Sequence, residues 1–423
     1  MFKTLHPNIR IRIYTSFLGR VIGSMIFPFM AIYFTNKINA TVAGVLLLIH
    51  VVVQFISGLY GGYLADLLGR KRMMVTGEWI RVIGVVGLIL VNSPWFVSPW
   101  ITFLMMLIIG ISSGLVNPAA EAMLIDVSTK ETRAFMYSIN YWAVNMSMMI
   151  GMIVGGWLYK DYFFELLLSL LVMSFVVLWM TVALIHETYV VQKTTKKEYG
   201  FSPLMKSYQT VIKDFPFVLF TLGGIMILAL EFQRNNFIAV RLEDEITSRV
   251  WSFWGGMNLN IDGVKLLSLL TVENTLIIVL FTAVASKWIK GRAEQSIMYM
   301  GFILFGSGYA IMAFSNSIPT LFLAIVVLSI GELLYVPTRQ SILADIVDDS
   351  KRGAYMAFNG FVFQVGKMLG ALGIIVGEVI GGIGMGVAYM VLVLMGIMFS
   401  RIGILKYSNQ KESSLFLETA KAK

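Results

Sequence analysis

Twelve apolar segments, each about 20 residues long, recur along the 423-residue chain. A helix of this length crosses the hydrocarbon core of a bilayer, where only helices or closed barrels satisfy all backbone polar groups. The pattern predicts an all-α polytopic membrane protein with twelve transmembrane helices. The segments lie at about 12–34, 42–64, 73–91, 99–125, 134–159, 163–186, 216–240, 266–286, 296–315, 319–344, 353–378 and 384–405.

The composition supports this class and excludes others. Hydrophobic residues make up 57% of the chain and charged residues only 13%, whereas a soluble protein carries about 25% charged residues. The chain has no cysteine, which excludes disulfides and thiolate metal sites. Its three histidines, His6, His50 and His186, are far apart and form no HExxH pattern. We therefore expect no metal site, no bound cofactor and no catalytic set, and hence no enzyme.

A duplication is visible within the sequence. Four pairs of identical residues recur at one constant spacing, and a glycine pair continues the match into the next segment. The matches bridge segments four and five of one half and segments ten and eleven of the other, which predicts two pseudo-symmetric six-helix bundles. Such parallel halves, with a site between them near the midplane, are typical of transporters. The pairs are Pro118/Pro337, Asp126/Asp345, Arg133/Arg352, Asn140/Asn359 and Gly151/Gly370.

The predicted domain organisation follows from the duplication. We expect an N-terminal bundle at 1–186, a basic cytoplasmic linker at 187–215, a C-terminal bundle at 216–406 and a cytoplasmic tail at 407–423. Most of the lysines and arginines outside the helices lie on the side of the termini, which predicts that both termini are cytoplasmic. This bias explains the net charge of +9 without a nucleic-acid partner. We expect a plasma-membrane protein that contacts lipid and is a monomer.

The stretch GGYLADLLGRKRM at 61–73 combines spaced glycines, an aspartate and a basic cluster. Glycines permit close helix packing and tight turns, and an aspartate can pair with a cation or cap a helix. The stretch resembles the loop 2–3 signature of the major facilitator superfamily, with Leu67 where an arginine is usual. The resemblance implies a cytoplasmic latch between the halves, and a plain topogenic loop is the alternative. The predicted gate residues are Gly62, Asp66, Gly69, Arg70, Lys71, Asp126, Arg133, Asp345 and Arg352, of which the last four have a solvated loop edge as the alternative.

Within the superfamily, the chain most resembles LmrP-type multidrug/proton antiporters. The resemblance rests on the latch and on the stretches TRAFMYSINYWAVNMSMMIG (132–151) and IGELLYVPTRQSILADIV (330–347). It implies that Glu332 takes part in substrate binding and proton exchange. Two further membrane carboxylates of the family fall on Asn140 and Asn235 here, which we retain as substrate-binding candidates. The stretch GMIVGG (151–156) resembles the antiporter motif, with Met152 in place of proline.

Four ionisable residues lie well inside the apolar segments, where charge is costly and usually functional. Arg20 lies in the first segment, Glu231 and Arg234 lie three residues apart in the seventh, and Glu332 lies in the tenth. The resemblance places all of these segments around the central cavity. A carboxyl group in a low-dielectric site can bind and release protons near neutral pH. We predict proton coupling by Glu332 and Glu231, and substrate binding by Arg20, Arg234 and Glu332.

Other charged residues within the predicted spans are weaker candidates for a functional role. Glu273 and Lys367 are secondary candidates, whereas Glu78 and Arg81, three residues apart, are expected to form a structural pair. For Glu332 itself, the alternative to transport chemistry is a permanent bridge to an arginine.

The resemblance and the charges within the spans together lead us to expect a secondary active transporter that exports amphipathic drugs or other lipophilic compounds in exchange for protons, by alternating access. The protons act as the coupling ion and the substrate is a small amphipathic molecule. The alternative is the same fold with a different cargo, either a lipid or lysolipid or an imported anionic or zwitterionic solute.

Overall fold

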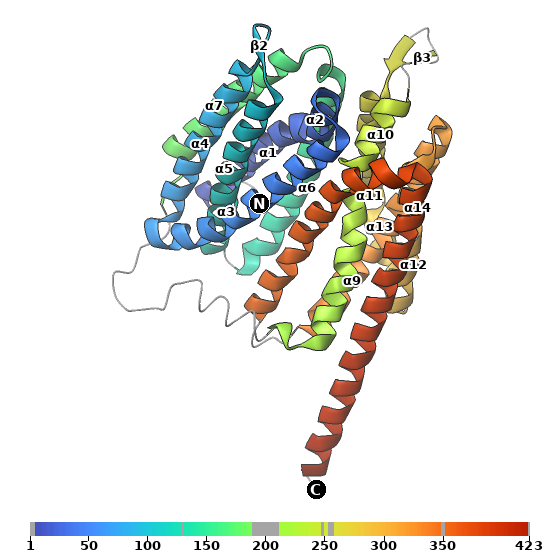
Figure 1. Ribbon diagram of the computed structural model, residues 1–423. Helices are drawn as coiled ribbons and strands as arrows, with labels where there is room; N and C mark the ends of the chain where they lie inside the picture. Colours follow the sequence, from blue (N-terminus) through green and yellow to red (C-terminus); the bar gives the residue numbers. More distant parts are fainter. Residues whose placement is uncertain are drawn as a thin grey trace. The chain divides into compact units, whose positions relative to one another are not determined.

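The computed structural model describes residues 5–128, 130–187, 211–246, 249–252, 258–347 and 352–421. The described chain is almost entirely helical, and its only sheets are two short antiparallel hairpins (Figure 1). One hairpin joins β1 (Asn92–Ser93) to β2 (Phe96–Val97), and the other joins β3 (Arg249–Ser252) to β4 (Asn258–Ile261). The expected all-α fold is confirmed.

The first half begins with α1 (Pro7–Ile26), which a short 3-10 turn (Phe27–Phe29) links to α2 (Met30–Lys37). Pro28 lies in that turn and has no backbone N–H to donate, so the regular helix is interrupted there. The helices that follow are α3 (Ala40–Leu68), α4 (Arg70–Leu90), α5 (Pro99–Asp126), α6 (Lys130–Leu158) and α7 (Phe163–Ala183).

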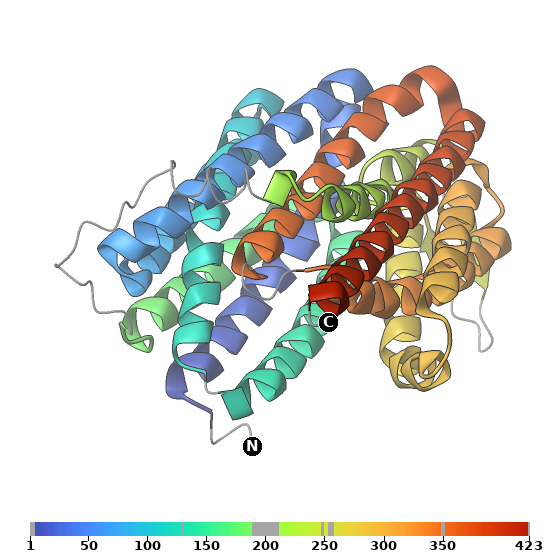
Figure 2. The ribbon, with the colours of Figure 1, turned by 90° about the horizontal axis from the view of Figure 1, so that it is seen from below.

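The second half contains α9 (Phe215–Glu231), α10 (Phe237–Glu245), α11 (Gly263–Ile289), α12 (Glu294–Phe314), α13 (Ile318–Ile346) and α14 (Arg352–Lys421). Helix α14 breaks at Gly381, which has a φ of 68°. In both views α9 lies between the two arms of α14 that this break creates (Figures 1 and 2). The second arm continues as a helix to Lys421, so the predicted tail begins inside a helix.

These helices account for the twelve predicted spans. Within the described residues, nine helices are long and apolar enough to cross a membrane, and the last of them contains the break at Gly381. Two shorter apolar helices, Trp142–Leu158 and Phe215–Glu231, supply the remaining spans. Most of the predicted linker at 187–215 lies outside the described residues.

Contacts divide the chain into two compact units. The first comprises Met1–Lys197 with Leu242–Val272, and the second comprises Glu198–Arg241 with Glu273–Lys423. Helices α10 and α11 each pass from one unit into the other. The units are defined by contacts and the predicted domains by sequence, so the boundaries at 186, 215 and 406 stay a prediction.

The two units repeat one packing scheme. In the first unit α4 packs on α5 and α1 packs on α6, and in the second α12 packs on α13 and α9 packs on α14. Gly151 of α6 lies against Val21 and Ser24 of α1, while Gly370 of α14 lies against Phe232 at the end of α9. The duplicated glycines thus serve the same helix pair in each half.

The expected continuous helix over 216–240 is wrong. Helix α9 ends at Glu231 and α10 begins at Phe237, with a tight turn between them. The Asn236 side chain donates to the carbonyl oxygen of Phe232 (2.7 Å), a local bond that competes with the helical pattern. In the membrane such a break is tolerated only where protein or a cavity satisfies the freed backbone, and discontinuous helices commonly form transporter sites.

Candidate functional site

The turn after α9 places Arg234 inside the second unit. Arg234 is only 8% exposed. Its Nε and one terminal nitrogen donate to the hydroxyl oxygen of Tyr309 on α12 (3.3 and 3.1 Å). Its other terminal nitrogen donates to Oδ1 of Asn274 on α11 (2.9 Å). The buried guanidinium is therefore held by neutral partners from two helices.

Asn274 connects this arginine to Glu332 on α13. Its Nδ2 donates to Oγ of Ser329 (2.8 Å) and to Oε2 of Glu332 (3.1 Å). The ion pairs found among the described residues do not include Glu332. Arg234 is connected to Glu332 through the side-chain amide of Asn274. Among the described residues, Glu332 therefore does not form the permanent salt bridge to an arginine that was the alternative to transport chemistry.

Glu231 completes the cluster. It is half-buried at the end of α9, and the charges of Glu332 and Arg234 both act on it. We name Glu231, Arg234, Asn274, Tyr309 and Glu332 the α9–α13 cluster. With both carboxyls ionised, this cluster carries two negative charges against one positive charge. It retains one negative charge in an apolar setting, where uncompensated charge is costly.

Sequence reasoning missed the neutral members of this cluster. Asn274 and Tyr309 are buried polar side chains within apolar helices. Such groups need hydrogen-bond partners inside a bilayer, so an asparagine in the run VENTLIIVL was an available signal.

The other predicted substrate residues lie on three different segments of the chain. Asn235 is half-buried in the turn after α9, and Asn140 is half-buried on α6. Arg20 is exposed on α1, and within its unit the charge of Glu121 acts on it.

The secondary candidates differ from the cluster. Glu273 lies beside Asn274 in sequence and is half-buried, and its Oε2 has no hydrogen-bond partner among the described residues. The ammonium group of Lys367 lies 4.9 Å from the ring of Phe363.

A second buried charge group lies in the first unit. Glu78 and Arg81 form the expected ion pair on α4 (2.9 Å), and Glu78 is 2% exposed. Arg12, at the start of the first predicted segment, is buried within α1 and donates to Thr15 and Ser16 (3.1 and 3.0 Å).

The predicted latch residues of the first half come together. Arg70 Nε lies 2.5 Å from Oδ2 of Asp126, and Arg70 Nη2 lies 3.5 Å from Oδ1 of Asp66. Gly69 has a φ of 98° and separates α3 from α4 without a longer loop. The backbone N–H of Lys71 donates to Oε2 of Glu187 (2.9 Å), and a carboxylate at a helix N-terminus is favourable.

Gly62, a predicted gate residue, is packed less tightly than its neighbour Gly61. A methyl group there would meet Pro118 only at ordinary contact distance (3.7 Å), whereas one on Gly61 would lie 2.3 Å from the carbonyl oxygen of Gly114. The close approach of α3 to α5 therefore depends on Gly61.

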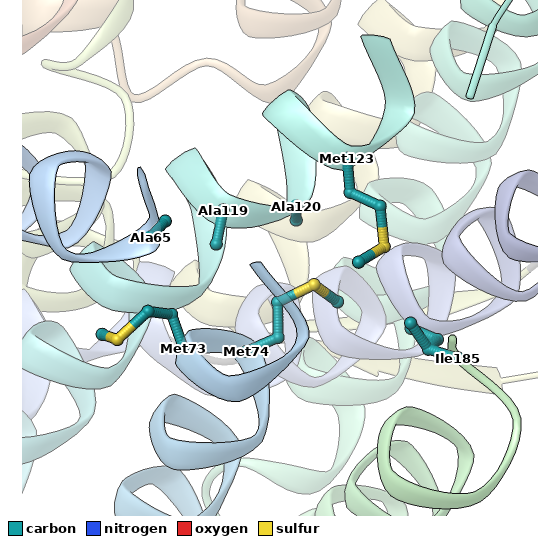
Figure 3. Packing of buried hydrophobic residues seen from close by; sticks show 7 residues of the cluster. All are labelled: Ala65, Met73, Met74, Ala119, Ala120, Met123 and Ile185. Atoms are coloured by element: carbon teal, nitrogen blue, oxygen red, sulfur yellow. The ribbon is translucent and has the colours of Figure 1, made fainter. Parts of the chain in front are cut away.

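An apolar cluster that includes Ala65 and Met73 lies next to the predicted latch residues. Figure 3 shows Met74 of α4 and Met123 of α5 pointing toward one another, with Ile185 beside them. Next to Ile185, the backbone of His186 exchanges two hydrogen bonds with the buried side chain of Asn8 (2.8 and 3.1 Å). The chain segment after α7 is thereby fixed to α1 through Asn8, and to α4 and α5 through Ile185.

The remaining predicted gate residues are Asp345, Arg133 and Arg352. Asp345 is exposed near the end of α13, and its carbonyl oxygen accepts a hydrogen bond from the hydroxyl group of Tyr407. Arg133 and Arg352 lie in the first turns of α6 and α14, but their side chains lie outside the described residues.

Comparisons with known proteins agree with this architecture. The sequence model described as Major Facilitator Superfamily matches residues 13–243 and 247–418. A Na(+), Li(+), K(+)/H(+) antiporter of Planococcus maritimus is 29% identical over 380 residues, which cover 88% of this chain and 90% of that protein. Multidrug resistance protein MdtH of Photorhabdus laumondii is 26% identical over 358 residues, which cover 82% of this chain and 81% of that protein.

Solved structures give the same fold. A POT family transporter crystallised with a thioalcohol conjugated peptide has a TM-score of 0.75 at 16% identity, covering 95% of this chain and 96% of that one. With the family match over nearly the whole chain, the chain belongs to the Major Facilitator Superfamily, and it is a membrane transporter and not an enzyme.

Proposed function

We propose that the protein is a proton-coupled antiporter that exports positively charged amphipathic compounds by alternating access. The observation that carries the proposal is the charge balance of the α9–α13 cluster. Arg234 compensates only one of the carboxylates Glu231 and Glu332, and its donors are already bonded to Tyr309 and Asn274. The remaining negative charge favours the binding of one proton or one cation.

Competition between a proton and a substrate cation for this negative charge accounts for the exchange of one for the other across the membrane. Once a proton neutralises the cluster, a substrate cation no longer finds an uncompensated carboxylate there. Substrate binding in turn favours the ionised carboxyl and promotes release of the proton. Proton and substrate therefore exclude one another, which is what an antiporter requires.

Alkali-cation exchange is the second candidate. The relative from Planococcus maritimus is named as an antiporter of Na(+), Li(+) and K(+) for H(+). An alkali cation carries the same single charge, and hard cations take oxygen ligands such as carboxylates. The same cluster therefore suits this cargo as well.

The remaining cargo alternatives have less support. An imported anionic or zwitterionic solute would not find Arg234 free, because its guanidinium is bonded on both sides within the protein. A lipid or lysolipid has no specific observation in its favour.

The wider scheme follows the sequence predictions. The protein spans the plasma membrane as a monomer with both termini in the cytoplasm. Asp66, Arg70 and Asp126 act in the cytoplasmic gate, and Arg20, Asn140 and Asn235 contribute to the substrate site. Protons are the coupling ion, and membrane lipids surround the helices.

Transport by proteoliposomes tests the proposal. Purified protein is reconstituted, a pH gradient is imposed, and movement of a cationic dye and of Na⁺ is followed separately. We expect proton-driven dye movement that Glu332→Gln abolishes. Glu273→Gln, which removes a carboxylate from the neighbouring position of α11, is the matched control and is expected to retain transport. Movement of Na⁺ alone would select the second candidate, and full activity of Glu332→Gln would refute both.

A further inference from the structure

We infer that Asn274 is a positioning residue that sets how readily Glu332 binds a proton. This inference rests on the proposed function, because it concerns the carboxyl group that the proposal makes the coupling site. It adds a residue on α11 that neither bears charge nor matches a sequence motif.

The chemistry of the partners fixes the orientation of the Asn274 amide. A guanidinium has only donors, so the Asn274 atom that faces Arg234 at 2.9 Å must be the carbonyl oxygen. The NH₂ group must then face Ser329 and Glu332, at 2.8 and 3.1 Å. Arg234 thus determines that Glu332 receives a donor.

A donor at this position favours one protonation state. Oε2 of Glu332 accepts from Asn274, and a carboxylate accepts hydrogen bonds more strongly than a neutral carboxyl group does. The bond therefore stabilises ionised Glu332 and opposes proton uptake. Asn274 is 6% exposed, so water cannot readily replace it when it is removed.

The hydrogen bonds of Asn274 indicate that this residue does more than fill space in the core. Its amide makes three hydrogen bonds, to residues on two different segments of the second unit, the turn after α9 and helix α13. Asn236, by comparison, bonds with its Nδ2 to the carbonyl oxygen of Phe232 four residues earlier. Asn236 provides a matched asparagine close to the same cluster.

The test is a pH titration of Glu332 in the purified, full-length protein in lipid nanodiscs. The infrared band of the protonated carboxyl group is followed, and Glu332→Gln identifies the contribution of Glu332. Asn274→Asp keeps the side-chain shape but replaces the donor by an acceptor, and Asn274→Ala removes the bonds without adding charge. Loss of a hydrogen bond to a charged group corresponds to about one to two pH units.

We expect both Asn274 variants to move the midpoint of Glu332 protonation to higher pH by about that amount, and Asn236→Ala to leave it unchanged. An unchanged midpoint in Asn274→Ala overturns the inference, because Asn274→Asp also adds a like charge that raises the midpoint by repulsion. If Asn274→Ala does not fold, the uncharged Asn274→Leu, which is similar in size to asparagine, decides the matter. The titration needs no transport. A shifted midpoint with intact proton-driven transport in Glu332→Gln would therefore refute the proposed function and leave the role of Asn274 standing.

Discussion

Single residues determine the local geometry of the α9–α13 cluster and of the predicted latch. Arg234 and Glu332 were predictable as membrane charges, because their cost in hydrocarbon singles them out. Asn274 was not, because one neutral polar residue barely alters the hydropathy of a helix such as α11. The bond from Asn274 to Glu332 depends on the distance between α11 and α13, which sequence spacing does not encode.

Gly69 offers a test at the same scale. Its φ of 98° and ψ of 146° lie in a region that is essentially open to glycine alone, and an added methyl group would lie 2.7 Å from Oε2 of Glu187. We expect Gly69→Ala to lower the free energy of unfolding by about 1–3 kcal/mol. Thermal unfolding of the purified protein in detergent measures this.

Gly58 is the matched control for that substitution. It lies within helix α3, and a methyl group there would meet nothing within 4 Å. Gly58→Ala should be neutral or slightly stabilising, since alanine favours a helix by about 0.5–1 kcal/mol. Equal destabilisation by the two substitutions would show that the turn at Gly69 is not strained by a side chain.

Whole elements were predicted better than their interruptions. The spans follow from apolar length, and α5 agrees with its predicted range almost to the residue. The break after Glu231 was missed because apolar residues continue on both sides of it. The break depends on packing against α14, where Gly373 leaves room for the side chain of Gln233. Such a contact between segments far apart in sequence carries no local signal.

The contact between the α6–α7 turn and α10 gives a pH-dependent prediction. Lys160 Nζ lies 2.7 Å from Oε1 of Glu243 and 3.4 Å from Oδ2 of Asp262. Burial alone would lower the pKa of Lys160, but its bonds and charge interactions with Glu243 and Asp262 outweigh this and raise the pKa. Burial raises the pKa of Glu243, aided by the charges of Asp262 and Asp244 and opposed by Lys160.

Both shifts give stability that is lost as pH rises, each in its own window. For Lys160, the contribution is complete below its unfolded pKa and is lost only in the alkaline range above it. For Glu243, ionisation in the folded protein costs free energy as pH rises from its unfolded pKa through its raised folded pKa. The positive charge of Lys160 reduces the free-energy cost of ionising Glu243 in the folded protein. Removing Lys160 therefore destabilises the protein mainly at pH values where Glu243 is ionised.

We therefore expect Lys160→Met to destabilise the protein more at pH 8 than at pH 5. Because the Lys160 side chain is 36% exposed, solvent screening limits the difference to at most about 1 kcal/mol. Melting temperatures of variant and wild type at the two pH values measure it. Lys265→Met is the control, since the ammonium group of Lys265 donates to the carbonyl oxygen of Asn260. A larger loss at pH 5 would contradict the assignment.

At the scale of the molecule, the internal duplication made the arrangement of helices in the two halves predictable from the sequence. The paired Pro118 and Pro337 lie within α5 and α13, and the paired glycines pack equivalent helices. The halves nevertheless carry different polar groups. The latch pairs Asp66, Arg70 and Asp126 in the first unit, whereas the α9–α13 cluster lies in the second. The repeat predicts the framework, and the departures from it coincide with the proposed functional sites.

The central claim is that a proton and a substrate cation compete for the one uncompensated charge of the α9–α13 cluster. The most direct measurement is proton release when a cationic dye is added to the purified protein in weakly buffered solution. The account predicts that about one proton leaves per dye molecule bound near neutral pH, and that Glu332→Gln suppresses this release. Dye binding without proton release, or release unchanged in Glu332→Gln, would contradict it.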